Sequence, residues 1–304
     1  MTPDNVLEPH RDFKSGLVAI VGAPNAGKST LLNRLLGQKI SITSKKPQTT
    51  RNRILGVMDR PGAQLIFLDT PGVHRAGKPL NVRIVDVALS TLADADLVLV
   101  MMDAAAPDSD AENYLIEKLA ARATPAVLAL NKIDLIHKPQ LLALIERWSR
   151  AHNFTAVVPV SAVKGTQLDG LVDAMIQVLP QGPPLFPPGS LTDLPERFIA
   201  GEMIREKVFR LTGEEVPYAV AVTIDAFKEE KGGRLVKIHA TIHVERNSQK
   251  GIVIGKGGAK LKQIGEAARR EIERMLGCRV FLKLFVRVQK NWSRDSKAMA
   301  RFGY

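Results

Sequence analysis

The chain has 304 residues, of which 45% are hydrophobic and 24% charged, and its formal net charge is +12. This length suits two domains, and the composition is typical of a globular protein rather than a disordered or fibrous one. No apolar run reaches the length of a membrane-spanning helix, and we expect no signal peptide because residues 1–14 are polar. Cys278 is the single cysteine, which excludes an intramolecular disulfide and predicts a reducing, cytoplasmic location.

The positive charge is unevenly distributed along the chain. Residues 1–180 contain 20 Lys and Arg against 17 Asp and Glu, a net charge of +3. Residues 181–304 contain 23 against 14, a net charge of +9. The asymmetry predicts a polyanionic partner for the C-terminal part, either nucleic acid or an anionic surface, with a merely solubilising surface as the alternative.

A phosphate-binding motif, GxxxxGK[ST], occupies Gly22–Ser29. It lies between a predicted strand at 17–21 and a predicted helix at 29–36, which is the context in which this motif binds nucleotides. Its glycines allow backbone amides to surround a phosphate, Lys28 can reach the β- and γ-phosphates, and the Ser29 hydroxyl can hold Mg²⁺. The predicted phosphate contacts are Gly22, Asn25, Ala26, Gly27, Lys28, Ser29, Thr30 and Gly72.

Two further segments favour control of the metal and the γ-phosphate. Residues 41–53 are polar, basic and without periodicity, and we interpret them as a long functional loop. In this loop Thr50 is favoured as the residue that senses Mg²⁺ and the γ-phosphate, and Thr49 remains an alternative. Asp69 ends a predicted strand and suits control of Mg²⁺, while Gly72 could approach the γ-phosphate closely because it has no Cβ.

Strands and helices alternate through the first half of the chain. This alternation predicts an α/β fold, a mostly parallel sheet with helices on both faces and ligands beyond the carboxyl ends of the strands. The strands are expected at 53–58, 64–68, 96–102, 126–130 and 156–160, and the later helices at 110–122, 140–150 and 168–179. The phosphate motif, Asp69, Asn131–Asp134 and Ser161 then fall at one edge of the sheet.

The motif Asn131-Lys-Ile-Asp134 predicts guanine as the base. The Asp134 carboxylate can accept hydrogen bonds from guanine N1–H and the 2-amino group, a donor pair that adenine lacks. The stem of Lys132 could cover the ring, and the Ala162 amide, after Ser161, could donate to guanine O6. The predicted guanine-binding residues are Asn131, Lys132, Asp134, Ser161 and Ala162.

These motifs resemble the guanine-nucleotide-binding domain of translation-factor-related GTPases over residues 16–180. A water-orienting glutamine is missing after Gly72, where Val73 and then His74 stand, and we do not assign His74 as a base. We therefore expect slow intrinsic hydrolysis. The resemblance further implies that Asn25 holds a monovalent cation, commonly K⁺, beside the phosphates.

A Pro- and Gly-rich segment, 181–193, separates the predicted GTPase domain from a second domain at 194–304. Residues 1–15 are expected to form a loose N-terminal arm. In the second domain we expect a helix at 195–211, antiparallel strands at 218–227 and 235–244, a helix at 259–276 and a strand at 280–288.

A GxxG loop, Gly255-Lys-Gly-Gly258, lies between two apolar helical segments of the second domain. The pattern and the element order match a type II KH domain, an α+β fold that binds single-stranded RNA. The glycines allow close approach to a sugar–phosphate strand, while lysines bind phosphates and an apolar groove takes bases. The predicted RNA contacts are Ile252, Ile254, Gly255, Lys256, Gly257, Gly258, Lys260 and Lys262.

The whole chain resembles the bacterial ribosome-assembly GTPases of the TrmE-Era-EngA-like family, the Era family in particular. The shared features include the Pro-Asn-Ala-Gly-Lys-Ser motif, the Lys-Pro-Gln-Thr-Thr-Arg loop, Gly-Lys-Gly-Gly and the terminal Lys290-Asn-Trp292. The resemblance implies binding to the 3′ end of 16S ribosomal RNA on the 30S subunit and nucleotide-sensitive switches at 41–53 and 73–78. We expect the protein to be a monomer. The resemblance also includes a weak peripheral contact with the inner membrane. The alternative function is a signalling NTPase whose basic domain binds a membrane surface.

Overall fold

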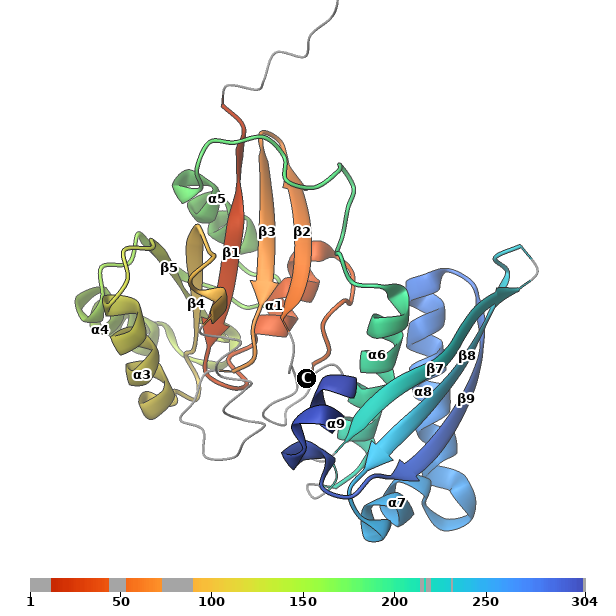
Figure 1. The fold of residues 1–304 in the computed structure, drawn as a ribbon. Coiled ribbons are helices and arrows are strands. Elements are labelled where there is room, and N and C mark those ends of the chain that lie inside the picture. Colours follow the sequence, from red (N-terminus) through yellow and green to blue (C-terminus); the bar gives the residue numbers. More distant parts are fainter. Residues whose placement is uncertain are drawn as a thin grey trace, which may run out of the picture. The chain divides into compact units, whose positions relative to one another are not determined.

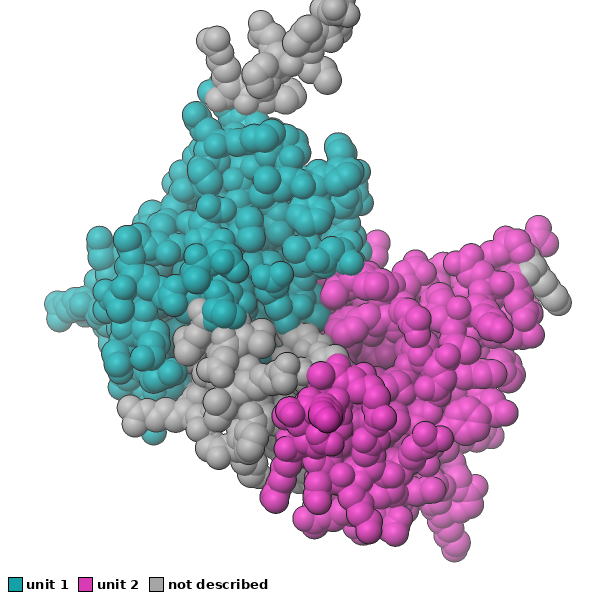
Figure 2. Space-filling model, viewed as in Figure 1, with its two compact units in different colours: residues 1–37, 53–75, 88–193 teal, residues 38–52, 76–87, 194–304 magenta. Residues whose placement is uncertain are grey.

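The computed structural model describes residues 12–43, 53–72, 90–213, 216, 220–230 and 232–302. The chain divides into two compact units, each described separately below (Figure 2). Unit 1 comprises residues 1–37, 53–75 and 88–193, and unit 2 comprises residues 38–52, 76–87 and 194–304. Most of the predicted switches, residues 44–52 and 73–78, lie outside the described residues, and with them Thr49, Thr50, Val73 and His74.

Unit 1 is built on a six-stranded sheet with the strand order β2-β3-β1-β4-β5-β6. The strands are β1 (Lys14–Gly22), β2 (Ile54–Arg60), β3 (Ala63–Asp69), β4 (Leu97–Asp103), β5 (Ala126–Asn131) and β6 (Ala156–Pro159). β2 and β3 form an antiparallel hairpin, and every other pair of neighbours is parallel. The strands β3, β4 and β5 are buried throughout because they are continuous apolar runs covered on both faces, as parallel strands require.

Helices cover both faces of this sheet (Figure 1). The helices are α1 (Lys28–Leu36), α3 (Ser109–Ala120), α4 (Lys138–Ala151) and α5 (Leu168–Val178), with a short 3₁₀ helix η1 (Ile133–Leu135) after β5. On one face, Leu115 and Leu119 of α3 and Trp148 of α4 join a buried cluster with alternate residues of β1, β4 and β5. The predicted α/β architecture is confirmed.

Two boundaries of unit 1 differ from the predictions. β1 begins at Lys14, so the last two residues of the predicted arm, 1–15, belong to the sheet and pair with Ala63 and Gln64. The predicted linker, 181–193, lies along the β2–β3 hairpin. The Gln64 side chain accepts hydrogen bonds from the amides of Leu185 and Phe186 at 2.7 and 2.8 Å, and it donates to Phe186 O at 3.0 Å. This segment therefore belongs to unit 1 by its contacts.

Unit 2 contains a three-stranded sheet in the order β7-β8-β9. Its elements are α6 (Glu196–Leu211), β7 (Ala221–Glu230), β8 (Leu235–Val244), α7 (Asn247–Ile254), η3 (Lys256–Gly258), α8 (Ala259–Leu276), β9 (Arg279–Val288), η4 (Trp292–Arg294) and α9 (Ser296–Arg301). β7 and β8 are antiparallel, and β8 and β9 are parallel. The order of elements is that expected for a type II KH domain.

The helices α6 and α8 pack on one face of this sheet and against each other. They bury Ile204 and Val208 of α6 with Ile264 and Ile272 of α8, all at 0% exposure. The strand predicted at 218–227 instead runs from Ala221 to Glu230, so it continues into the charged residues that the sequence placed in a turn.

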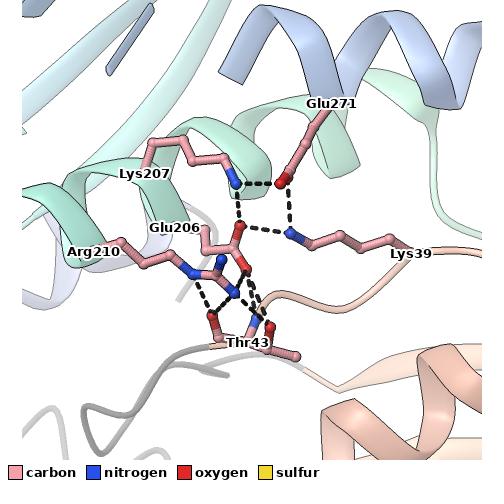
Figure 3. A network of polar contacts seen from close by, with 6 residues as sticks. All are labelled: Lys39, Thr43, Glu206, Lys207, Arg210 and Glu271. Carbon is pink, nitrogen blue, oxygen red and sulfur yellow. Dashed lines mark hydrogen bonds and ion pairs between the residues drawn. The ribbon is translucent and has the colours of Figure 1, made fainter. Parts of the chain in front are cut away.

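A network of charged side chains joins the segment after α1 to α6 and α8 within unit 2 (Figure 3). The buried Glu206 carboxylate accepts hydrogen bonds from Lys39 Nζ at 2.6 Å and Lys207 Nζ at 2.7 Å. It also accepts from the Thr43 amide at 3.0 Å. Both lysines bind Glu271 as well. Burial alone raises the pKa of Glu206, but the hydrogen bonds from Lys207 and Lys39 outweigh it and lower that pKa to about 2.

Candidate functional site

The phosphate-binding loop connects the end of β1 to the start of α1. Within it Asn25 and Gly27 have φ angles of 64° and 103°, in the left-handed region. A Cβ at Gly22 would lie 2.3 Å from Met101 O, and a Cβ at Gly27 would lie 2.2 Å from the Asn131 amide nitrogen. Both positions therefore require glycine for steric reasons. The predicted strand–loop–helix context of the motif is confirmed.

The Lys28 side chain lies inside this loop and binds its backbone carbonyls. This side chain is buried, and Nζ donates to the carbonyls of Gly22 at 3.0 Å and Ala23 at 2.9 Å. Burial lowers the pKa of Lys28 to about 8, although the charge of Asp69 acts in the opposite direction. An amine held in this way at the N-terminus of α1 can exchange its carbonyl partners for phosphate oxygens.

The carboxyl end of β3 meets the first turn of α1. Ser29 Oγ donates to Asp69 Oδ2 at 2.7 Å. Thr70 Oγ1 donates to Ile20 O at 2.7 Å and fixes the turn that follows β3. A Cβ at Gly72 would lie 2.8 Å from the Pro24 backbone, so glycine permits this close approach. A hydroxyl and a carboxylate oxygen side by side are ligands that Mg²⁺ prefers, so Ser29 and Asp69 fit a magnesium site.

Asn131 connects the phosphate loop to the loop after β6. Its amide nitrogen donates to Ala26 O at 2.8 Å, and its Oδ1 accepts from the Ala162 amide at 3.0 Å. The sequence predicted a base contact for Asn131 and a guanine O6 contact for the Ala162 amide. In the structure these two groups are hydrogen-bonded to each other, so Asn131 bridges two loops, and their contacts with the base stay predictions. Ser161 is fully buried and its Oγ accepts from the Lys164 amide at 3.1 Å.

Lys132 is held by a residue that sequence reasoning did not select. Its ammonium group forms an ion pair with Asp103, which ends β4 and also accepts from the Ala105 amide at 3.0 Å. Lys132 has a φ angle of 67°, and Asp134 follows it as an exposed residue of η1. The sequence contains a signal for Asp103, because it is an acidic residue at the end of an apolar run. The structure adds that Asp103 lies opposite Asn131 in the β4–β5 pairing.

The GxxG loop lies between α7 and α8, as predicted. Gly255, Gly257 and Gly258 all have φ angles in the left-handed region, from 58° to 82°. A Cβ at Gly255 would lie 2.7 Å from Lys260 Cβ, so only glycine fits there. Of the predicted apolar contacts, Ile252 is 38% exposed and Ile254 is half-buried. The side chains of Lys256 and Lys262 are exposed beside the loop.

Comparison with known proteins identifies both units. A family model described as a 50S ribosome-binding GTPase matches residues 17–132, and a KH domain model matches residues 215–293. A curated relative, GTPase Era of Geobacter metallireducens, is 54% identical over 292 residues, which cover 96% of this chain and 98% of the relative. The chain belongs to the Era family of GTPases. GTPase Era of Geotalea uraniireducens is likewise 54% identical, over 97% of this chain and 99% of the relative.

Two solved structures of the Era family match both units. One is an Era variant from Aquifex aeolicus bound to GDP and AlF₄⁻, with a TM-score of 0.90 and 44% identity over 96% of this chain and 99% of that one. The other is Era in complex with MgGDPNP and nucleotides 1506–1542 of 16S ribosomal RNA. It has a TM-score of 0.92 and 44% identity, with the same coverage of both chains.

Membership of the Era family assigns the chemistry of unit 1. The chain is a GTPase, and its predicted fold of a P-loop domain followed by a KH domain is confirmed. Within the ranges that the structure describes, no helix is both long enough and apolar enough to cross a bilayer.

Proposed function

We propose that this Era-family GTPase binds the 3′ region of 16S ribosomal RNA through its KH domain and assists assembly of the 30S subunit. The observation that carries the proposal is that one chain combines a guanine-nucleotide site, formed by the motifs at one edge of the unit 1 sheet, with a GxxG loop. The 44% identical relative that was solved with MgGDPNP and 16S ribosomal RNA supports the same pairing of ligands. We expect the protein to act as a monomer in the cytoplasm.

In the proposed nucleotide complex, residues of the phosphate-binding loop and of the neighbouring strand ends each have a separate role. Lys28 binds the β- and γ-phosphates, Ser29 and Asp69 hold Mg²⁺, and Asp134 pairs with the guanine edge. Lys132, oriented by Asp103, covers the base. When bound, Mg²⁺ supplies charge neutralisation at the phosphates. Because no glutamine follows Gly72, we expect slow intrinsic hydrolysis that a further component accelerates.

Asn25 is the proposed ligand for a K⁺ ion. It is exposed on the phosphate loop, and its side-chain oxygen is a hard ligand of the kind that K⁺ accepts. Because its φ angle is 64°, Asn25→Gly removes the side chain without adding backbone strain. We expect wild-type GTP turnover to be faster in KCl than in NaCl and the variant to show no such difference. Equal turnover of the wild type in both salts would exclude the K⁺ site.

A matched pair of glycine variants tests the RNA-binding role. Gly257 and Gly232 have φ angles of 58° and 63°, and a Cβ at either position meets nothing within 4 Å. Gly257→Asp and Gly232→Asp therefore introduce the same charge and the same strain, one in the GxxG loop and one between β7 and β8. We expect only Gly257→Asp to weaken binding to a 16S ribosomal RNA 3′ fragment, by at least tenfold, with GTP binding intact.

Binding measurements on the wild type, together with these two variants in cells, separate the proposal from the alternative signalling function. RNA binding through phosphates should weaken steeply as the salt concentration rises. If the wild type does not bind the ribosomal RNA fragment at about 100 mM salt but binds anionic vesicles, the membrane alternative is correct. In cells depleted of the native GTPase, we expect Gly257→Asp, but not Gly232→Asp, to accumulate immature 30S subunits.

A further inference from the structure

One face of β9 carries basic and aromatic side chains in strict alternation. The residues at every second position are Arg279, Phe281, Lys283, Phe285 and Arg287, which we call the β9 outer row. All five are exposed, with Phe281 at 50% and Phe285 at 45%. Exposed phenylalanines are costly in water unless a partner covers them, and here two lie on the same edge strand.

The opposite face of β9 explains why the row points outward. The residues between those of the outer row alternate with them and face the helices, where Val280 is buried and Leu284 lies against Gly265 of α8. Since successive side chains of a strand point to opposite faces, the sheet separates the outer row from α8. The outer row is therefore a different surface from the one on which the core of unit 2 is built.

Another part of the same outer face is already covered by the end of the chain. Trp292, Met299 and Phe302 pack with Ala221 of β7 in a small apolar cluster, and the ring of Phe302 lies 4.5 Å from that of His243. The apolar residues there are buried by the protein itself. The β9 outer row receives no comparable cover from the described residues, so its exposed rings are available to another molecule.

The charges of this face favour an anionic partner. Among the described residues, no carboxylate forms an ion pair with Arg279, Lys283 or Arg287. Lys283 Nζ instead lies 5.2 Å from the centre of the Phe285 ring, in cation–π contact. Asp225 of β7 accepts a hydrogen bond from Thr241 Oγ1 at 2.6 Å and forms no ion pair with the row. The row thus presents three cations without ion-pair partners among the described residues, with Lys283 between the two rings and Arg279 and Arg287 on either side of them.

A hollow beside Phe285 extends this surface toward the start of α7. Its volume is about 530 Å³, which is within the range of sites that hold small organic groups. Its lining consists of Asp225, Thr241, Asn247, Lys250, Phe285, Val286, Arg287 and Val288. The lining combines one aromatic ring, hydrogen-bonding side chains and two cations with one carboxylate, so its formal charge is positive and it can bind a nucleotide through stacking and phosphate contacts.

We propose that the β9 outer row is a second binding surface for single-stranded RNA, separate from the GxxG loop. Phe281 and Phe285 would stack on bases, and Arg279, Lys283 and Arg287 would bind the phosphates between them. A membrane fits less well, because Lys283 lies between the two rings and would enter the bilayer with them. The inference rests on the proposed RNA-binding function and extends the bound strand beyond the GxxG groove.

The test compares RNAs of two lengths. The double variant Phe281→Ala/Phe285→Ala is measured by fluorescence anisotropy with a short oligonucleotide that fills only the GxxG groove and with a longer single strand. The control, Leu142→Ala/Val163→Ala, removes two hydrophobic side chains of unit 1 that are each 67% exposed. Circular dichroism and the thermal midpoint verify that each variant folds.

The expected result is a loss of at least tenfold in affinity for the long strand and less than twofold for the short one, with no change in the control. Two stacked bases are enough for such a loss. The Gly257→Asp variant, in which the β9 outer row is unchanged, should still bind the long strand weakly. Adding Lys283→Ala to that variant should reduce the salt dependence of this remaining binding. Photo-crosslinking of 4-thiouridine in the long strand should label peptides of β9.

Three outcomes would overturn the proposal. The double variant could bind both RNAs like the wild type, in which case the GxxG loop alone binds RNA and the proposed function stands. It could instead lose binding to phosphatidylglycerol vesicles while RNA binding is unchanged, which would assign the row to a membrane. If the wild type binds neither RNA, both this inference and the proposed function fail.

Discussion

Lys39 Nζ and Glu206 Oε2 lie 2.6 Å apart, although 167 residues separate them in the sequence (Figure 3). Lys39 follows α1 closely, whereas Glu206 is in the middle of α6, and both belong to unit 2 by their contacts. The stretch from Gln38 to Thr43 is therefore part of the packing of unit 2, although its sequence position is inside the GTPase motif series. Arg210, one turn after Glu206, completes the attachment by donating to Thr43 O at 3.0 Å.

Removing the Glu206 carboxylate should destabilise unit 2. Glu206→Ala removes the buried carboxylate that Lys39 and Lys207 share and leaves both lysines only Glu271, so we expect the free energy of unfolding to fall by about 3 kcal/mol. Urea unfolding followed by Trp292 fluorescence in a Trp148→Phe background reports on unit 2. The control is Glu230→Ala, which breaks an ion pair of unit 2 whose two side chains are 44% and 37% exposed and should cost less than about 1 kcal/mol. Equal losses in the two variants would contradict the assignment.

The same carboxylate predicts a pH dependence. The pKa of Glu206 is lowered from 4.5 to about 2 in the folded state, so its stabilising contribution is fully present above pH 4.5. It is lost as the pH falls from 4.5 toward 2, because protonation then favours the unfolded chain. The stability difference between wild type and Glu206→Ala should therefore be larger at pH 7 than at pH 3.

Lys28 should make nucleotide affinity depend on pH. Its pKa in the free protein is lowered to about 8 by burial, and bound phosphates favour the charged amine and raise that pKa. GDP affinity should therefore be nearly constant below pH 8 and fall by up to about tenfold between pH 8 and 9. Isothermal titration at pH 8.5 in buffers of different ionisation enthalpy should detect proton uptake. Lys28→Arg keeps its charge, so its residual affinity should not change over this range.

Asn131 should matter for the position of two loops as well as for the base. Asn131→Ala leaves Ala26 O and the Ala162 amide without their partner, and we expect unit 1 to lose about 2 kcal/mol of unfolding free energy. GDP should dissociate at least tenfold faster. The matched control is Asn153→Ala, an exposed residue that should change neither quantity. If GDP dissociation is unchanged in Asn131→Ala, the bridge has no role in binding.

Asp134 should determine base choice without contributing to stability. It is exposed, so Asp134→Asn should leave the unfolding midpoint unchanged. The asparagine side chain has one acceptor oxygen and so cannot accept from both guanine N1–H and the 2-amino group, whereas its amide nitrogen can donate to the 2-oxo group of xanthine. Preference should therefore shift from GDP toward XDP. We expect a shift of about 100-fold or more in competition binding. An unchanged preference for GDP would show that another group recognises the base.

The local motifs were predictable because each depends on consecutive residues. Gly255 is required by a close approach to Lys260 just after its own loop, and the spacing of Lys28 and Ser29 follows from the start of α1. The neighbours that require glycine at 22 and 27, Met101 and Asn131, are distant in the sequence, and there only the motif itself was predictable. The order of strands and helices was also predictable, since continuous apolar runs indicate buried parallel strands. Element ends were less predictable. β7 ends at Glu230, later than predicted, and the Glu230 carboxylate forms an ion pair with Lys237 of β8. The register of β7 with β8 also changes between Ile224 and Ala226.

Contacts between distant residues could not be read from the sequence. The Lys132–Asp103 pair depends on the register of β4 with β5, and the Asn131 bridge depends on the loop after β6. Likewise, the exposure of Phe281 and Phe285 depends on where the C-terminal helix ends on the outer face. The sequence by itself determined which loops can hold phosphate, guanine and RNA, because backbone conformation and side-chain chemistry are local properties. Only the tertiary structure decided which charges meet and which rings stay exposed, because these follow from sheet register and packing between segments far apart in the chain.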